Sequence, residues 1–200
     1  NSIKPFSEAI RIASIYRISP HMAELVIRES EKMFGGVPGF LLGVNDGIFA
    51  PNAGIDCSNI HSGHAILYPH NPHRLVEQIR KMILINLGRK IGVVLTDSRL
   101  LPGRKGTTGT TVAAAGFKPV VDERGKRDLF GNFMNVTSKA LADDVSAAAQ
   151  LIMGETDEMR PIVIVRNSGI DMYDGVLDSE ALTVKPEECV YLRGLVDKAD

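Results

Sequence analysis

Apolar residues recur at helical spacing in three segments of the chain. The first segment, Ile18 to Phe34, begins with Ser19 and Pro20, a favoured helix cap and first helical residue, and it stops before Gly35-Gly36. The other two segments also have helical spacing and plausible ends. The pattern therefore predicts helices over residues 18–34, from Asn71-Pro72 to Gly88, and over 140–153.

Shorter apolar runs predict strands. Residues 39–44 and 48–50 flank the turn sequence Asn45-Asp46-Gly47, which is typical of a hairpin. The wholly apolar runs 91–95 and 161–165 predict strands buried on both faces. Weaker strand candidates cover 112–121 and 133–138, and the acidic stretch 171–188 is expected to be mostly loop.

Strands and helices mix without strict alternation, which favours an α+β fold or a mixed sheet over a Rossmann domain. The length of 200 residues fits one substantial domain. With 44% hydrophobic and 24% charged residues, the chain has ordinary globular composition, which excludes disorder and coiled coil as the main state. We find no internal repeat in the sequence.

The charge and hydropathy of the chain limit the kinds of partner that it can bind and indicate its cellular compartment. The net charge of −1 offers no global field for nucleic acid or an anionic membrane. We find no apolar run near the roughly 20 residues that a membrane helix needs, and no signal-peptide pattern. Two cysteines outside a CxxC pair indicate reduced thiols. We therefore expect a cytoplasmic protein that binds neither nucleic acid nor membrane.

Two aspartates follow predicted strands and are the first candidates for chemistry. Asp56 is followed by Ser58 and Asn59, and Asp97 is followed by Ser98. Carboxylate, hydroxyl and amide oxygens are the donors that Mg²⁺ or Mn²⁺ requires, with phosphate and water completing the shell. The alternative is that each aspartate caps its own turn through the backbone.

The stretch 99–111 is rich in glycine and threonine and has no clear periodicity. Glycines let backbone N–H groups turn towards an anion, while Arg104 and Lys105 add positive charge. From Arg99 to Lys139 there are eight basic and three acidic residues, a local excess of +5 suited to a small polyanion. A solvated, flexible loop is the alternative interpretation.

Histidines form a third candidate group. His61, His64, His70 and His73 show two HxxH spacings, which are compatible with zinc. However, Pro69 and Pro72 interrupt the segment, so a surface loop is the favoured interpretation. Cys57 lies beside this group and is expected to be a buried structural thiol rather than a nucleophile.

Several of these segments together resemble a known family. The run Asn52-Ala53-Gly54-Ile55-Asp56-x-Ser58-Asn59 resembles the N-A-G-[IV]-D-x-S-N motif of the coenzyme F-420-0:L-glutamate ligases, also called F-420 gamma-glutamyl ligases. Residues 93–98 are similar to the family's V-V-x-T-D-[ST]. Further matches extend the resemblance from about residue 11 to residue 166, and they include Asp128-x-x-Gly131, Ala142-Asp143-Asp144, Met153-Gly154-Glu155 and the strand 161–166.

The resemblance implies an activity and a fold. Family enzymes use GTP and Mg²⁺ or Mn²⁺, often with K⁺, to join L-glutamate to the lactate carboxyl of F-420-0 through an acyl phosphate. A second glutamate is then added through a gamma linkage. The implied fold is a mixed-sheet α+β arrangement in an intertwined homodimer. Family members also carry an N-terminal segment that helps shape the nucleotide site. We therefore expect one ligase-like domain over residues 1–200, without that segment.

The resemblance also implies roles for individual residues. Asp56 and Asp97 would bind metal with help from the Ser98 hydroxyl, and Glu155 stands where the family usually has a glutamine near metal and phosphates. Asn59 would contact the nucleotide. Arg104 and Asp128 would be catalytic residues. The GTP site would include Met153, Gly154, Glu155 and Thr156.

Two departures from the family pattern affect the acceptor side. Leu100-Leu101 replaces a Gly-Arg pair, and Phe130-Gly131-Asn132 replaces an aromatic or histidine followed by Gly-Arg. These changes leave open a paralogue with another acceptor, or a catalytically silent relative that binds nucleotide or an F-420-like ligand. A zinc hydrolase that uses the histidine group is a third possibility.

Overall fold

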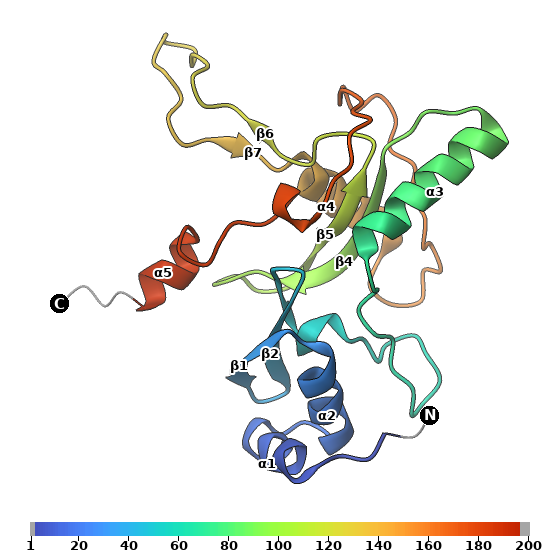
Figure 1. Cartoon of the computed structure of the whole chain (residues 1–200), viewed down its shortest axis with the longest axis vertical. Coiled ribbons are helices and arrows are strands. Elements are labelled where there is room, and N and C mark those ends of the chain that lie inside the picture. Colours follow the sequence, from blue (N-terminus) through green and yellow to red (C-terminus); the bar gives the residue numbers. More distant parts are fainter. Residues whose placement is uncertain (1–2, 197–200) are drawn as a thin grey trace. The chain divides into compact units, whose positions relative to one another are not determined.

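A computed structural model of the chain describes residues 3–196, which divide after His70 into two compact units. Each unit combines helices with antiparallel strands (Figure 1), so the predicted α+β class is confirmed. The described strands form three separate antiparallel sheets instead of one mixed sheet. Within residues 3–196, no helix is both long and apolar enough to cross a membrane.

The first unit begins with two helices, α1 (Ser7–Tyr16) and α2 (Pro20–Glu29). The Ser19 side chain accepts a hydrogen bond from the Met22 N–H at 3.0 Å, which confirms the predicted cap. The predicted extension of this helix to residue 34 is wrong. The Ser30 backbone is extended, and residues 32–37 form strand β1 (Lys32–Val37) against β2. Helix α1 is not among the helices predicted from the sequence.

The predicted hairpin is confirmed. Strand β2 (Phe40–Asn45) pairs with β3 (Ile48–Pro51), and Asp46 and Gly47 occupy the left-handed turn with φ of 50° and 72°. Because β1 pairs on the other side of β2, the sheet has three strands. A short 3-10 turn, η1 (Asn52–Gly54), follows β3 and opens the loop that carries Asp56.

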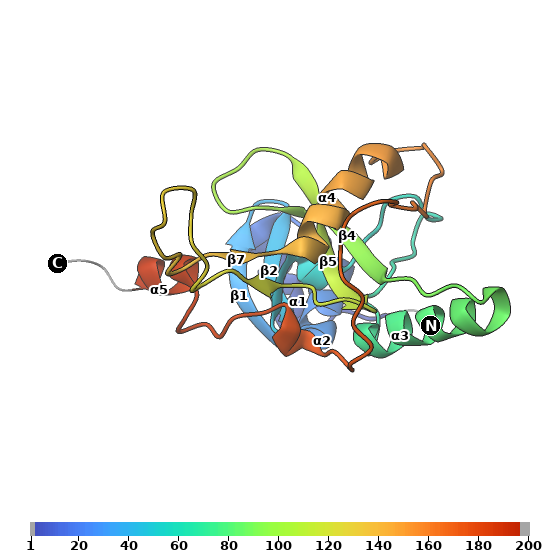
Figure 2. The same cartoon turned by 90° about the horizontal axis from the view of Figure 1, so that it is seen from above.

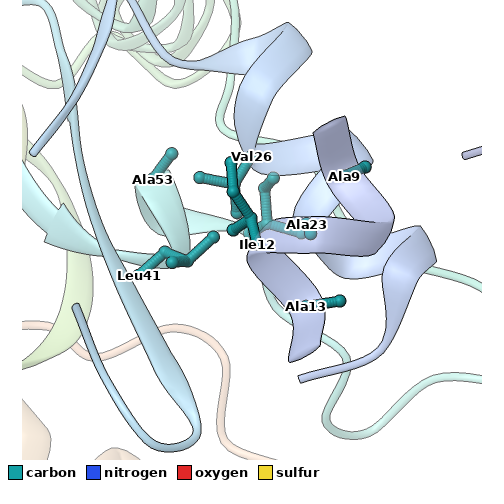
Figure 3. Packing of buried hydrophobic residues seen from close by; sticks show 8 residues of the cluster. Ala9, Ile12, Ala13, Ala23, Val26, Leu41 and Ala53 are labelled. Atoms are coloured by element: carbon teal, nitrogen blue, oxygen red, sulfur yellow. The ribbon is translucent and has the colours of Figure 1, made fainter. Parts of the chain in front are cut away.

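The core of this unit lies between the two helices, the sheet and the η1 turn. Ile12 of α1, Val26 of α2, Leu41 of β2 and Ala53 of η1 are each at most 3% exposed, and they lie near one another in Figure 3. Apolar contact among these side chains stabilises the position of η1 against the sheet. The Asp56 loop therefore begins from a packed base.

A buried carboxylate in α2 makes this unit sensitive to acid. Glu24 is 2% exposed, and it accepts hydrogen bonds from the Phe6 N–H at 2.9 Å and from Arg28. The backbone N–H of Phe6, reinforced by Arg28, lowers the pKa of Glu24. Stability from this group is therefore complete above its ordinary pKa of 4.5, and it is lost as pH falls through the lowered value.

We expect Glu24→Gln to flatten the acid side of the stability profile. The variant should be less stable than the wild type near pH 7, and the difference should shrink as pH falls below about 4. Urea unfolding monitored by circular dichroism from pH 7 to pH 3 measures this, with Glu187→Gln at an exposed position as the control. A constant difference at every pH would contradict the assignment.

The second unit is built on the hairpin of β4 (Val93–Leu100) and β5 (Thr107–Ala115), with α3 (Pro72–Leu87) on one face and α4 (Leu141–Met153) on the other. Val76 of α3 packs on Ala113 and Ala115, whereas Ala142 of α4 packs with Ala114. The alternation of these alanines places the two helices on opposite faces, as Figure 2 shows. Both predicted helices are confirmed, and Gly88 ends α3 in the left-handed conformation (φ 61°).

A β-bulge in β5 changes which side chains face α4. Leu95 pairs with Ala113 but Thr96 pairs with Thr111, so Val112 is an extra residue. Beyond it, Thr111 turns towards α4, and its N–H donates to Asp143 Oδ1 at 2.8 Å. The bulge therefore lets an apolar half and a polar half of one strand both contact α4.

Three sequence predictions in this unit need correction. The loop predicted over 99–111 is mostly strand, because its threonines pair with β4, and only residues 101–106 form the connection. Residues 91–95 are not buried on both faces as predicted, since most of them are half-exposed. The strand continues through residue 100. The run 161–165 is not a buried strand: Ile162 and Ile164 are 83% and 72% exposed, since no described strand pairs with them.

The remaining elements are short. The weaker candidate 112–121 is strand only as far as Ala115, and β6 (Val121–Asp122) pairs with β7 (Ser138–Lys139) at the base of a long arm. In Figure 1 this arm projects away from α4. The stretch 171–188 is mostly loop, as predicted, with one 3-10 turn, η2 (Ser179–Ala181), and it is followed by α5 (Val190–Val196).

Candidate functional site

The loop that carries Asp56 is fixed by hydrogen bonds to the sheet. Asn52 Oδ1 accepts from the Leu41 N–H at 3.0 Å, and Asn45 Nδ2 donates to the Ala53 carbonyl at 2.8 Å. Asn52 and Ala53 are left-handed, with φ of 50° and 55°, a strained conformation that such contacts maintain. The Asp56 backbone then pairs with Ile66 in both directions, at 3.0 and 2.8 Å. Asp56 is thus an exposed carboxylate on a well-supported loop.

The Asp56 carboxylate caps its own turn. Its Oδ1 accepts from the Ser58 N–H at 2.7 Å, and both oxygens accept from the Ser58 hydroxyl at 2.8 and 2.7 Å. This is the turn-capping arrangement that the sequence left open as an alternative. A carboxylate can accept more bonds than these, and the side chain is exposed, so capping is compatible with metal binding.

Asn59 follows this turn in the left-handed conformation (φ 51°). Together with Ile60, His61 and His64 it lines an open hollow of about 640 Å³. Residues 3–196 contain no group of three or more His, Cys, Asp or Glu side chains arranged to hold a metal ion. The histidine group therefore gives no support to a zinc site of that kind.

Cys57 is exposed, so the prediction of a buried thiol is wrong. Partial desolvation, with the neighbouring Asp56 charge, raises the pKa of the Cys57 thiol above its usual range. The thiolate is the reactive form, so a raised pKa disfavours a nucleophilic role at neutral pH. The negative charge of Asp56 remains the main electrostatic feature of this loop.

In the second unit, Asp97 lies within β4 and its side chain is 41% exposed. Its Oδ2 accepts from Arg99 Nε at 3.0 Å. Within residues 3–196 its Oδ1 has no hydrogen-bond partner, so that oxygen remains available to a ligand. Since successive strand residues alternate, Ser98 points to the α4 face and Asp97 to the other. The predicted cooperation of Ser98 with Asp97 is not apparent in this geometry and stays a prediction.

Glu155 lies just beyond the end of α4, where it is bonded to the beginning of β5. Its Oε1 accepts from Gln150 Nε2 at 2.7 Å and from the Thr107 hydroxyl at 2.9 Å. Gln150 also donates to the Gly154 carbonyl at 2.9 Å. The sequence analysis missed Gln150 and Thr107, although Gln150 stands one helical turn before the motif. These contacts hold 153–155 in a defined turn.

The next residues form a second small turn. The Glu158 carboxylate accepts from the Thr156 N–H at 2.8 Å, and this bond is the main cause that lowers the Glu158 pKa. Both Glu155 and Thr156 are exposed. The structure thus brings the predicted residues 153–156 to one end of the β4–β5 hairpin, the end at which β5 begins.

The catalytic candidates Arg104 and Asp128 occupy exposed turns. The Arg104 N–H donates to the Leu101 carbonyl at 3.1 Å in the short β4–β5 connection. Asp128 caps the tip of the β6–β7 arm: it accepts from the N–H groups of Phe130 and Asn132 at 2.9 and 2.8 Å and from Asn132 Nδ2 at 3.1 Å. Asn132, through its side chain and then its backbone, lowers the pKa of Asp128. Asp128 is therefore positioned as an ionised turn cap, and its catalytic role stays a prediction.

The basic excess of residues 99–139 is partly neutralised within the chain. Arg124 pairs with Asp122 at 2.7 Å and lowers the pKa of that carboxyl to about 2. Lys126 pairs with Glu123 at 2.6 Å. Arg104 and Lys105 are in no ion pair with residues 3–196, so they are the cations of the connection that can meet an anionic ligand.

Comparisons with known proteins cover the part of the chain that carries these residues. The sequence model described as F420-0:Gamma-glutamyl ligase matches residues 1–167, which include every candidate residue above. A protein named coenzyme F420:L-glutamate ligase from Methanopyrus kandleri is 31% identical over 96% of this chain and 77% of its own length. The one from Methanococcus maripaludis strain C6 is 33% identical over 96% and 76%.

A third relative of the same name, from Methanothermobacter thermautotrophicus, is 36% identical over 82% of this chain and 66% of its own length. These alignments span both units of the structure. The match of the family model over 1–167 and the three relatives lead to one conclusion: the chain belongs to the F420-0:gamma-glutamyl ligase family.

Proposed function

We propose that this protein is a GTP-dependent ligase that joins L-glutamate to F420-0, or to a closely related carboxylate, in the cytoplasm. The observation that carries the proposal is the family match over 1–167 together with the half-exposed Asp97, one of whose oxygens is free. Anionic substrates also suit the exposed cations of the β4–β5 connection.

The donor set fits a hard divalent cation. Asp56 and Asp97 would supply carboxylate oxygens, the donors that Mg²⁺ and Mn²⁺ prefer, with phosphate and water oxygens completing the shell. The proposed ligands are Asp56 and Asp97, with Glu155 and Ser98 as further candidates. The bound metal would withdraw charge from the phosphates, and K⁺ would assist. Asn59 and the turn 153–156 would hold the nucleotide.

The proposed reaction has two steps. The acceptor carboxylate oxygen forms a bond to the γ-phosphorus while the bond to the β-phosphate oxygen breaks, which releases GDP and gives an acyl phosphate. The glutamate nitrogen then attacks the acyl carbon, phosphate leaves, and the nitrogen loses a proton. Arg104 would stabilise negative charge on the transferred phosphoryl group. Asp128 would accept the proton, or it would shape the acceptor side through the turn that it caps.

A homodimer is part of the proposal. Many apolar side chains of the second unit are exposed in the single chain, among them Met82, Ile85, Ile162 and Ile164, each more than half exposed. Exposed apolar side chains that form a contiguous surface are typical of subunit interfaces. A second copy of the chain would cover it.

The test is glutamate-dependent phosphate release. We expect the wild type to release phosphate from GTP only when F420-0, glutamate and Mn²⁺ are all present, with the glutamylated product seen by mass spectrometry. Parallel reactions with ATP determine the nucleotide preference. The absence of product at any Mn²⁺ or K⁺ concentration would contradict the ligase assignment.

The second candidate function is that of a catalytically silent relative that binds nucleotide without turnover. Leu100 and Leu101 are each 44% exposed where the family motif has a glycine and a cation, and Asn132 is engaged with Asp128. Calorimetric binding of GTP with Mn²⁺, without phosphate release on addition of both other substrates, would favour this candidate over the ligase.

A further inference from the structure

Arg99 lies beside Asp97 on the same face of β4. The two side chains are two residues apart, and their strand partners are Thr108 and Thr110. Arg99 is 5% exposed, an unusual degree of burial for a guanidinium. No family motif described above assigns a role to this position.

One nitrogen of this buried guanidinium is unpaired. Arg99 Nε donates to Asp97 Oδ2 at 3.0 Å, whereas Nη2 is buried and has no hydrogen-bond partner among residues 3–196. A guanidinium presents its donors in a fixed planar fork, so the N–H bond of Nε and one N–H bond of Nη2 point in nearly the same direction. A buried charged donor without an acceptor is strongly unfavourable, which indicates that an acceptor is missing.

We propose that Arg99 is a positioning and phosphate-binding residue of the nucleotide site. Its Nε fixes the Asp97 carboxylate through Oδ2 and leaves Oδ1 for the ligand, while Nη2 donates to a phosphate oxygen of the nucleotide. This proposal rests on the proposed function in taking the nucleotide to bind beside Asp97. The phosphate provides the acceptor oxygen that Nη2 lacks among residues 3–196.

Arg99→Lys tests the proposal because lysine keeps the charge but loses the fork. We expect the affinity for GTP with Mn²⁺ to fall at least tenfold by calorimetry, with guanosine affinity unchanged. The matched control is Arg124→Lys, since Arg124 also pairs with an aspartate two residues before it but is 61% exposed. That variant should bind GTP like the wild type.

A second measurement observes the Arg99 guanidinium in the wild type itself. In ¹⁵N-arginine-labelled wild type, GTP with Mn²⁺ should shift one guanidinium signal, which the Arg99→Lys spectrum identifies. The Arg124 signal should stay in place. An unshifted Arg99 signal, or equal GTP affinity in Arg99→Lys and wild type with only a lowered melting temperature, overturns the proposal and leaves Arg99 a structural residue.

The two proposals fail in different ways. If the wild type binds no nucleotide, the proposed function fails, and inorganic phosphate then becomes the probe for Arg99. Phosphate binding that Arg99→Lys removes and Arg124→Lys retains supports an anion site at Arg99. Equal phosphate binding by both variants, or none by the wild type, overturns that site as well.

Discussion

Asp97→Ala is expected to abolish Mn²⁺-dependent binding of GTP and to reduce ligase turnover by about 10²–10³-fold or more. The reason is that, within the described residues, Asp97 supplies the only carboxylate oxygen on this face of β4 that is free of protein partners. Removing it also takes away the acceptor of Arg99 Nε, the one acceptor that this buried guanidinium has among residues 3–196. Calorimetry of GTP with and without Mn²⁺ measures the first effect, and product formation measures the second.

Asp122→Ala is the matched control for this experiment. Asp122 also pairs with an arginine two residues later, at 2.7 Å, but it lies at the base of the exposed arm. We expect its loss to leave GTP binding near the wild-type level. The metal assignment would be refuted by an Asp97→Ala variant that folds and binds GTP with an unchanged dependence on Mn²⁺.

Gly109→Ala is expected to destabilise the second unit by about 3 kcal/mol, the upper range for overpacking. A Cβ at this position would lie 2.4 Å from the Ser146 carbonyl oxygen and 3.2 Å from the Gln150 Cβ. The nearest atoms belong to the α4 backbone, so no side-chain rotation relieves the clash. Relief requires α4 to move away from β5, which would also weaken the bond between Thr111 and Asp143.

Gly194→Ala provides the comparison, because a Cβ there meets nothing within 4 Å and α5 tolerates alanine. Urea unfolding of both variants beside the wild type gives the difference in unfolding free energy. If Gly109→Ala unfolds at the same urea concentration as the wild type, close contact of α4 with β5 is not a requirement of this fold.

The elements that the sequence predicts well are those with local signals. Ser19 and Gly88 mark helix ends through their own side-chain or backbone chemistry, and the Asp46-Gly47 turn closes its hairpin within a few residues. The helix 140–153 is also correct, although Ile152, an apolar residue near its end, is 52% exposed. The apolar pattern identifies a helix more reliably than it identifies the buried face, which depends on neighbours.

The failures come from contacts that are distant along the chain. Met33 and Phe34 continue a helical pattern, yet pairing with β2 takes them into a strand. The threonines of β5 show no apolar alternation, because their partners are polar groups of α4 such as Ser146, 3.0 Å from the Thr111 hydroxyl. No local pattern predicts a strand whose inward face is polar.

The candidate site shows the same division. The motif residues can be identified from the sequence because each is a characteristic residue type within a characteristic run of residues. Their partners were not visible: Gln150 and Thr107 meet Glu155 only after α4 packs on β5, and Asn132 meets Asp128 only when the arm closes its tip. A single sequence therefore indicates where chemistry is placed but not which bonds hold it.

The extra residue Val112 has a consequence for how insertions and deletions act on this strand. On its C-terminal side the even-numbered residues face α4, and on its N-terminal side the odd-numbered ones do, so Val112 reverses the parity of β5. Deleting Val112 would restore one parity throughout. The two halves would then alternate as one regular strand, with Thr107, Gly109 and Thr111 still facing α4 and Glu155, Ser146 and Asp143 still opposite their partners, so this deletion removes the bulge without turning either half.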